Sequence, residues 1–179
     1  MRFLNHLLHI LYTSSLSTII LVMLLSLLLF ATLSTVYPKF VRRVSLSLYI
    51  FSVCAILLVT NIGRTSINIY QFSFIPFVRL YFTNESFRMY IMNAFLFFPY
   101  GLFLPYALPE RVKHPIRITI FSALLFSLII EIIQLIFRLG TCETDDVIMN
   151  TLGAAIGSFS YILSNWLRKR KEKRKVENT

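Results

Sequence analysis

The run SLIIEIIQLIFRLG contains polar side chains whose chemistry conflicts with their surroundings. Glu131, Gln134 and Arg138 follow one another at intervals of three and four residues. On a continuous helix they share one face, with Glu131 and Arg138 about 10 Å apart along the axis. A carboxylate and a guanidinium among isoleucines and leucines are costly unless they are paired or face a polar cleft. We predict that Glu131 and Arg138 pair, directly or through Gln134.

A second polar group opens the run DDVIMNTLGAAIG. Asp145 or Asp146 is expected to cap a helix, because a carboxylate there satisfies free backbone N–H groups. Asn150 lies one turn below Asp146 on the same face. Gly153 and Gly157 form a small-xxx-small pair that allows two helices to pack closely. We therefore assign both glycines to helix packing.

The run NAFLFFPYGLFLP begins with Asn93 and contains Pro99, Gly101 and Pro105. A helix with internal prolines is kinked, and the carbonyls it frees need partners. Pro99 and Gly101 are assigned to packing, although such a kink can also open a cavity.

These residues need elements to position them, and the composition indicates that the elements are transmembrane helices. Hydrophobic residues make up 56% of the 179 residues, and charged residues only 15%. A bilayer-crossing helix needs about 20 mainly apolar residues. Five segments qualify, so we predict an all-α, multi-pass transmembrane bundle with spans at residues 16–36, 44–62, 90–108, 116–137 and 147–167. Residues 3–12 are expected to form an interfacial helix.

The distribution of lysine and arginine predicts the orientation. Residues 168–179 form a strongly basic tail, which we place in the cytoplasm, where such tails contact anionic membrane lipids. The N-terminus, the connection 63–89 and the acidic loop 139–146 then lie outside. Within that connection, residues 70–74 alternate between apolar and polar, which indicates an extended or interfacial segment. Cys54 and Cys142 are far apart in the sequence and belong to no C-x-x-C or Cys/His spacing, so we expect no metal or other cofactor. We expect no nucleic-acid partner, because the sequence shows neither a basic folded surface nor a stacking platform.

This topology places eight polar residues from separate segments near the outer face: Arg64, Arg88, Asn93, Glu131, Gln134, Arg138, Asp146 and Asn150. Two interpretations are compatible with one another. The residues form a hydrogen-bonded network that holds helix ends together, or they line a polar cleft open to the outer leaflet.

The two runs NAFLFFPYGLFLP and EIIQLIFRLGTCETDDVIMNTLGAAIG resemble the signature stretches of the VanZ-like family of teicoplanin-resistance-associated integral membrane proteins. FIPF resembles that family's N-x-x-P-F region, although the asparagine is missing. The resemblance covers residues 64–157, within a VanZ-like transmembrane domain at residues 1–167. The resemblance implies a bacterial membrane protein. The residues that match the family's motif positions are Asn93, Pro99, Gly101, Glu131, Gln134, Arg138, Asp146, Asn150, Gly153 and Gly157.

Two functions follow as hypotheses. The first is a non-catalytic envelope protein that binds a lipid-linked cell-wall precursor or a lipoglycopeptide antibiotic and lowers susceptibility to teicoplanin-type drugs. The second is a membrane enzyme acting on such a precursor, with Glu131 and Asp146 as acid and base and Arg138 stabilising an anion. The sequence contains no nucleophile elbow, metal-ligand set or phosphate loop, which favours the first. A transporter is a weaker third, because no inverted repeat is present.

Overall fold

A computed structural model of the chain describes residues 14–61, 72–73, 77, 84–139 and 142–177. In chain order the elements are α2 (Leu16–Val36), α3 (Pro38–Asn61), β1 (Phe72–Ser73), α4 (Asn84–Ala107), α5 (Pro115–Ile136), β2 (Cys142–Glu143) and α6 (Thr144–Glu177). Within these residues, five helices are long and apolar enough to cross a membrane. The predicted all-α, five-span bundle is therefore confirmed.

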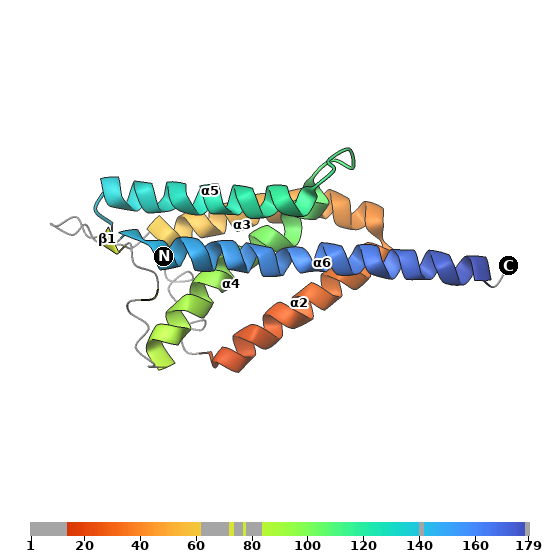
Figure 1. The fold of residues 1–179 in the computed structure, drawn as a ribbon, viewed down its shortest axis with the longest axis horizontal. Coiled ribbons are helices and arrows are strands. Elements are labelled where there is room, and N and C mark those ends of the chain that lie inside the picture. The colour runs from red at the N-terminus through yellow and green to blue at the C-terminus, as the bar shows by residue number, and fades with distance from the viewer. Residues whose placement is uncertain (1–13, 62–71, 74–76, 78–83, 140–141, 178–179) are drawn as a thin grey trace.

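The longest helix, α6, organises the bundle. Figure 1 shows α3 and α5 running alongside α6, whereas α2 and α4 cross it obliquely. The contact between α4 and α6 is the most extensive between any two described elements. Successive helices alternate in direction, so α3 and α5 finish at the end of the bundle where α4 and α6 begin (Figure 1).

Glycines allow α4 and α6 to approach this closely. A Cβ atom added to Gly101 would lie 1.9 Å from the carbonyl oxygen of Ala154. One added to Gly153 would lie 1.9 Å from the carbonyl oxygen of Ala94, and one added to Gly157 would lie 2.3 Å from that of Phe98. Each clash is with backbone, so a neighbouring side chain cannot move to relieve it.

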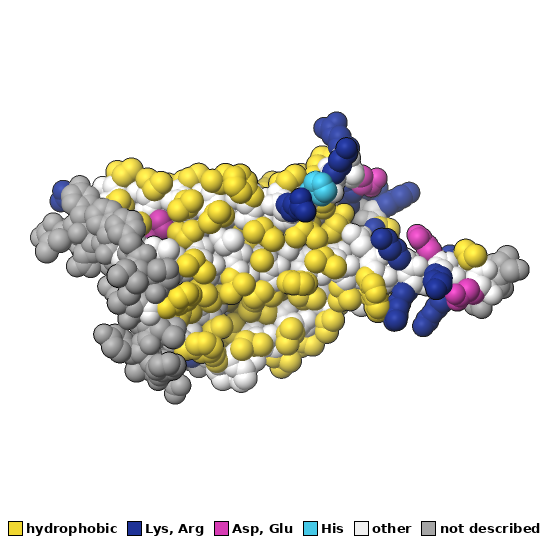
Figure 2. Space-filling model, in the orientation of Figure 1, with side chains coloured by type: hydrophobic (Ala, Val, Ile, Leu, Met, Phe, Trp, Pro, Cys, Tyr) yellow, Lys and Arg dark blue, Asp and Glu magenta, His cyan; other side chains and the backbone are white. Residues whose placement is uncertain are grey.

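The distribution of side chains is that of a membrane protein. Phe51 is 72% exposed, and large apolar side chains cover the outer faces of α2, α3 and α5. Small hydroxyl residues such as Ser34, Ser45 and Ser160 are fully buried between helices. Figure 2 shows the apolar band and, beyond it, the lysines and arginines gathered towards the C-terminal end of α6. Apolar residues outside and serines inside fit a lipid environment.

Several helices extend beyond their predicted spans. α3 begins at Pro38 rather than at residue 44, so Lys39, Arg42 and Arg43 lie on the helix and not in a loop. α6 begins at Thr144 and continues to Glu177, so the predicted basic tail from residue 168 prolongs the same helix. Hydropathy detects where a chain enters the bilayer, whereas the helix ends where its backbone hydrogen bonds stop.

The two ends of the bundle differ in charge. We call the end with Glu131, Glu143, Asp145 and Asp146 the acidic end. The other, with Lys39, Arg42, Arg43 and Arg168, we call the basic end. The predicted interfacial helix at residues 3–12 lies outside the described residues.

Candidate functional site

The acidic end is joined by a short parallel β-bridge. β1 pairs with β2, with Phe72 opposite Cys142 and Ser73 opposite Glu143. The Thr144 hydroxyl adds a hydrogen bond to the Ser73 carbonyl oxygen at 3.2 Å. The extended conformation predicted within residues 70–74 therefore holds for Phe72 and Ser73. This bridge attaches the long connection after α3 to the start of α6.

Glu131 and Gln134 occupy the buried face of α5. The Glu131 side chain is 3% exposed, and its Oε2 accepts a hydrogen bond from the Glu143 backbone N–H at 3.1 Å. Gln134 is 1% exposed and donates from Nε2 to the carbonyl oxygen of Thr60 at 2.9 Å. Thr60 lies in the last turn of α3. The polar face of α5 therefore connects the β-bridge on one side with α3 on the other.

Arg138 does not continue this face, which corrects the sequence interpretation. α5 ends at Ile136, and Arg138 has a left-handed backbone with φ 53°. The Arg138 N–H bonds the Leu135 carbonyl and the Leu139 N–H bonds the Gln134 carbonyl, which is the hydrogen-bond pattern of a Schellman helix end. Its side chain is exposed, whereas that of Glu131 is buried. Arg138 lies beyond the last turn of α5, where helical spacing no longer determines which face a residue occupies.

Two adjacent carboxylates tie the start of α6 to neighbouring segments. Asp145 is 4% exposed, and it accepts hydrogen bonds from the Phe77 backbone N–H at 2.7 Å and from the Tyr90 hydroxyl at 3.0 Å. Asp146 is half-buried, and its Oδ1 accepts a hydrogen bond from Nδ2 of Asn93. Both aspartates lie in the first turn of α6. They connect α6 to α4 and, through Phe77, to the connection that precedes α4.

Asn150, one turn deeper, links α6 to α5. Its Nδ2 donates to the Ser127 hydroxyl at 2.9 Å, and both side chains are buried. Its Oδ1 is buried and has no hydrogen-bond partner among the described residues. A buried acceptor of this kind normally meets a water molecule or a ligand donor. The Asn150 amide therefore has capacity for one more polar contact.

Sequence reasoning passed over two residues of this network, Tyr90 and Ser127, and named Asp145 only as an alternative helix cap. Asp145 is the more buried of the two aspartates, although Asp146 was the one selected. A signal was present, because Asp145 precedes Met149, Gly153 and Gly157 at intervals of four residues and so shares their packed face. Tyr90 and Ser127 could be recognised only once the partner helices were known.

Cys142 lies on β2 beside the carboxylates of the acidic end. Burial, and next the negative charge of Glu131, raise the pKa of the Cys142 thiol above its ordinary value. The thiol is therefore protonated at neutral pH. Within the described residues no group of three or more histidine, cysteine, aspartate or glutamate side chains has a metal-binding arrangement.

The other two arginines predicted for the outer face are Arg88 and Arg64. Arg88 lies in the first turns of α4 and is half-buried. Arg64 lies outside the described residues. The structure thus joins Asn93 to Asp146, Glu131 to the β-bridge and Gln134 to α3, in separate contacts at one end of the bundle.

The region containing these contacts matches a known family. Residues 18–165, which extend from the first turn of α2 into α6, match VanZ/LLP1. The chain belongs to the VanZ/LLP1 family. The resemblance predicted from the two signature runs is thereby confirmed, and the residues carried over from it all lie within the matched region of this VanZ/LLP1 member.

A curated relative is similar over part of its length. Protein VanZ of Enterococcus faecium is 39% identical over 83 residues, which make up 46% of this chain and 50% of that protein. The chain therefore spans about half the length of this relative. No solved structure matches the chain.

Proposed function

We propose that this VanZ/LLP1 protein is a non-catalytic envelope factor that lowers susceptibility to glycopeptide and lipoglycopeptide antibiotics of the teicoplanin type. Its acidic end faces outwards and binds an anionic group of the drug or of a lipid-linked cell-wall precursor at the outer leaflet. The observation that carries the proposal is the buried hydrogen-bonded network at that end, which lies within the family-matched region.

The carboxylates favour a scaffold over an enzyme. Glu131 accepts from a backbone N–H of the β-bridge, and Asp145 accepts from a second backbone N–H and a tyrosine hydroxyl. Asp146 accepts from the Asn93 amide. A general acid or base must instead present its carboxyl group to the substrate. The chain uses these carboxylates to hold its own segments in place.

The ligand-binding groups in this proposal are the arginines at the outer surface. Arg138 is exposed at the end of α5, and Arg88 lies on α4, which joins the same network. A guanidinium forms paired hydrogen bonds with phosphate or carboxylate groups. The buried carboxylates beneath them would fix the helix ends that carry these cations.

The orientation can be tested with the protein's own cysteine. In a Cys54→Ala variant, Cys142 is the single remaining cysteine. An impermeant thiol reagent should label Cys142 on intact cells. The rate should keep rising with pH beyond the range where an ordinary cysteine levels off, because the reactive thiolate forms only above the raised pKa. Glu131→Gln should speed labelling at fixed pH, since it removes a negative charge beside the thiol.

Labelling that requires permeabilised membranes would overturn the orientation. A labelling rate that Glu131→Gln leaves unchanged would show that this carboxylate does not act on the thiol.

The function is tested by expressing the protein in a glycopeptide-susceptible host and measuring the minimum inhibitory concentration of teicoplanin. The wild-type protein should raise it above the vector control. Glu131→Gln keeps the shape and an acceptor oxygen, so a binding scaffold should retain most of the protection. If Glu131 were a catalytic acid or base, its removal would lower turnover about 10²–10⁴-fold, and the protection against teicoplanin would be lost. Glu172→Gln, at an exposed carboxylate near the C-terminus, is the charge-matched control.

Protein amounts must be matched by immunoblot. Loss of protection in the Glu131→Gln variant at a normal protein level would contradict the scaffold proposal and would favour the enzyme hypothesis. If the wild-type protein gave no protection, both the scaffold proposal and the enzyme hypothesis would be contradicted.

A further inference from the structure

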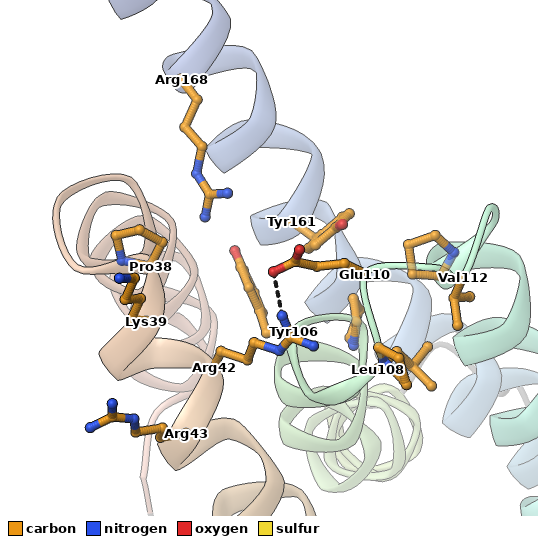
Figure 3. Close-up of a pocket in the computed structure, with 13 residues that line it drawn as sticks. Pro38, Lys39, Arg42, Arg43, Tyr106, Leu108, Glu110, Val112, Tyr161 and Arg168 are labelled. Atoms are coloured by element: carbon orange, nitrogen blue, oxygen red, sulfur yellow. Dashed lines mark hydrogen bonds and ion pairs between the residues drawn. The ribbon is translucent and has the colours of Figure 1, made fainter.

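The basic end contains a pocket unrelated to the network described above. It has a volume of about 520 Å³ and lies where the start of α3, the end of α4, the α4–α5 loop and α6 meet (Figure 3). Its walls come from segments far apart in the sequence, so the fold creates it. The proposed function assigns it no role.

Four cations and one carboxylate line this pocket. Lys39, Arg42 and Arg43 project from α3, and Arg168 projects from α6 (Figure 3). Among the described residues, the ion-pair partner of Glu110 is Arg42. Lys39 and Arg43 have no carboxylate partner within the part of the chain that the structure describes. The pocket therefore holds a clear excess of positive charge.

Arg168 is held in place by the protein. Its Nη2 donates to both the carbonyl oxygen and the hydroxyl of Ser34, at 2.9 and 2.6 Å. Ser34 is fully buried, so it is a fixed anchor. The Nε of Arg168 is buried and has no hydrogen-bond partner among the described residues. A fixed guanidinium with an unsatisfied donor is prepared for an anion or a bound water.

The remaining wall is apolar and stiff. Pro38, Pro105 and Pro109 line it, together with Tyr106 and Leu108. The Tyr106 hydroxyl shares a hydrogen bond with Ser160 at 2.9 Å, which fixes the ring. A site for a free anion needs no such wall. An apolar surface beside a cluster of cations suits an amphiphile with a charged head.

We propose that this pocket binds the phosphodiester headgroup of an anionic phospholipid from the adjoining leaflet. The phosphate lies among Lys39, Arg43 and Arg168, and the glycerol end of the lipid lies against the prolines. The pocket lies at the basic end of the bundle, and Figure 2 shows the lysines and arginines gathered beyond the apolar band, which is the depth of lipid headgroups. The inference goes beyond the proposed function and does not depend on it.

The test measures the melting temperature of the full-length protein in a neutral detergent with one of three additions: phosphatidylglycerol, phosphatidylcholine or inorganic phosphate. A ligand that binds only the folded state raises the melting temperature as its concentration rises. Phosphatidylglycerol should raise it, and the other two should not. A Lys39→Gln/Arg43→Gln variant should lose most of that shift while melting normally without lipid, because both side chains are exposed.

A Lys171→Gln/Arg174→Gln variant is the charge-matched control, because these exposed cations lie on α6 beyond the pocket. It should keep the full shift. If the pocket variant melts early without lipid, the single Lys39→Gln and Arg43→Gln variants are compared instead, and each should lose part of the shift.

Three results would overturn the proposal. An equal phosphatidylglycerol shift in the pocket and control variants would assign binding to the general surface charge. A phosphate shift as large as the lipid shift would identify a free-anion site. An equal shift with phosphatidylcholine would show that net headgroup charge is not recognised.

Discussion

Replacing Gly153 with alanine is expected to prevent the bundle from assembling. The new Cβ would lie 1.9 Å from the Ala94 carbonyl oxygen, far inside van der Waals contact. Overpacking a core costs about 1–3 kcal/mol even where side chains can adjust. Here the obstacle is backbone, so α4 and α6 must separate along their most extensive contact, and we expect the loss to exceed the upper end of that range.

The measurement is the amount of monodisperse protein recovered in detergent and its melting temperature. Gly157→Ala should behave similarly, because its Cβ would lie 2.3 Å from the Phe98 carbonyl oxygen. Leu152→Ala is the neighbouring control. Leu152 is 47% exposed on the outer face of α6, and its truncation should leave both readings near those of the wild type. Wild-type recovery and melting of Gly153→Ala would show that α4 and α6 are not in backbone contact.

Asp145→Ala is expected to destabilise the protein by about 2–3 kcal/mol, the cost of losing two hydrogen bonds to a buried carboxylate. The Phe77 N–H and the Tyr90 hydroxyl would both lose their acceptor. Asp145→Asn should cost less, because the amide oxygen can still accept from Phe77 and its NH₂ group can donate to Tyr90. The free energy of unfolding in detergent distinguishes the two variants.

Tyr90→Phe provides the control for this hydrogen bond. It removes one donor to Asp145 and leaves the aromatic ring packed against Phe77, with ring centroids 5.6 Å apart. In the double variant, Tyr90→Phe should cost little once Asp145 is alanine, because the bond is already lost. Fully additive losses would show that the two residues stabilise the fold independently.

The membrane spans could be predicted from the sequence because hydropathy reports the bilayer directly. The predicted span at residues 16–36 coincides with α2, which has no charged residue. The prediction failed at ends where a helix continues past the lipid, as at Pro38 and Glu177. Nothing in an apolar window records how far backbone hydrogen bonding persists in water.

The candidate site was predictable only where its contacts are local. Glu131 and Gln134 share a buried face because they lie three residues apart within α5. Arg138 is not on that face because α5 ends before it. The residue with the left-handed backbone at this helix end is usually a glycine, and an arginine in that position gives no sequence signal that the helix ends there. The bond between Tyr90 and Asp145 joins residues on two helices, so the topology had to be known first.

The single uninterrupted helix α6 sets the spacing between the two ends of the bundle. Asp145 and Arg168 are about 35 Å apart along it, since each helical residue adds about 1.5 Å. Hydrogen bonds hold both residues, Asp145 to Phe77 and Tyr90, and Arg168 to Ser34. The distance between the network at the acidic end and the pocket at the basic end is therefore fixed by one continuous backbone.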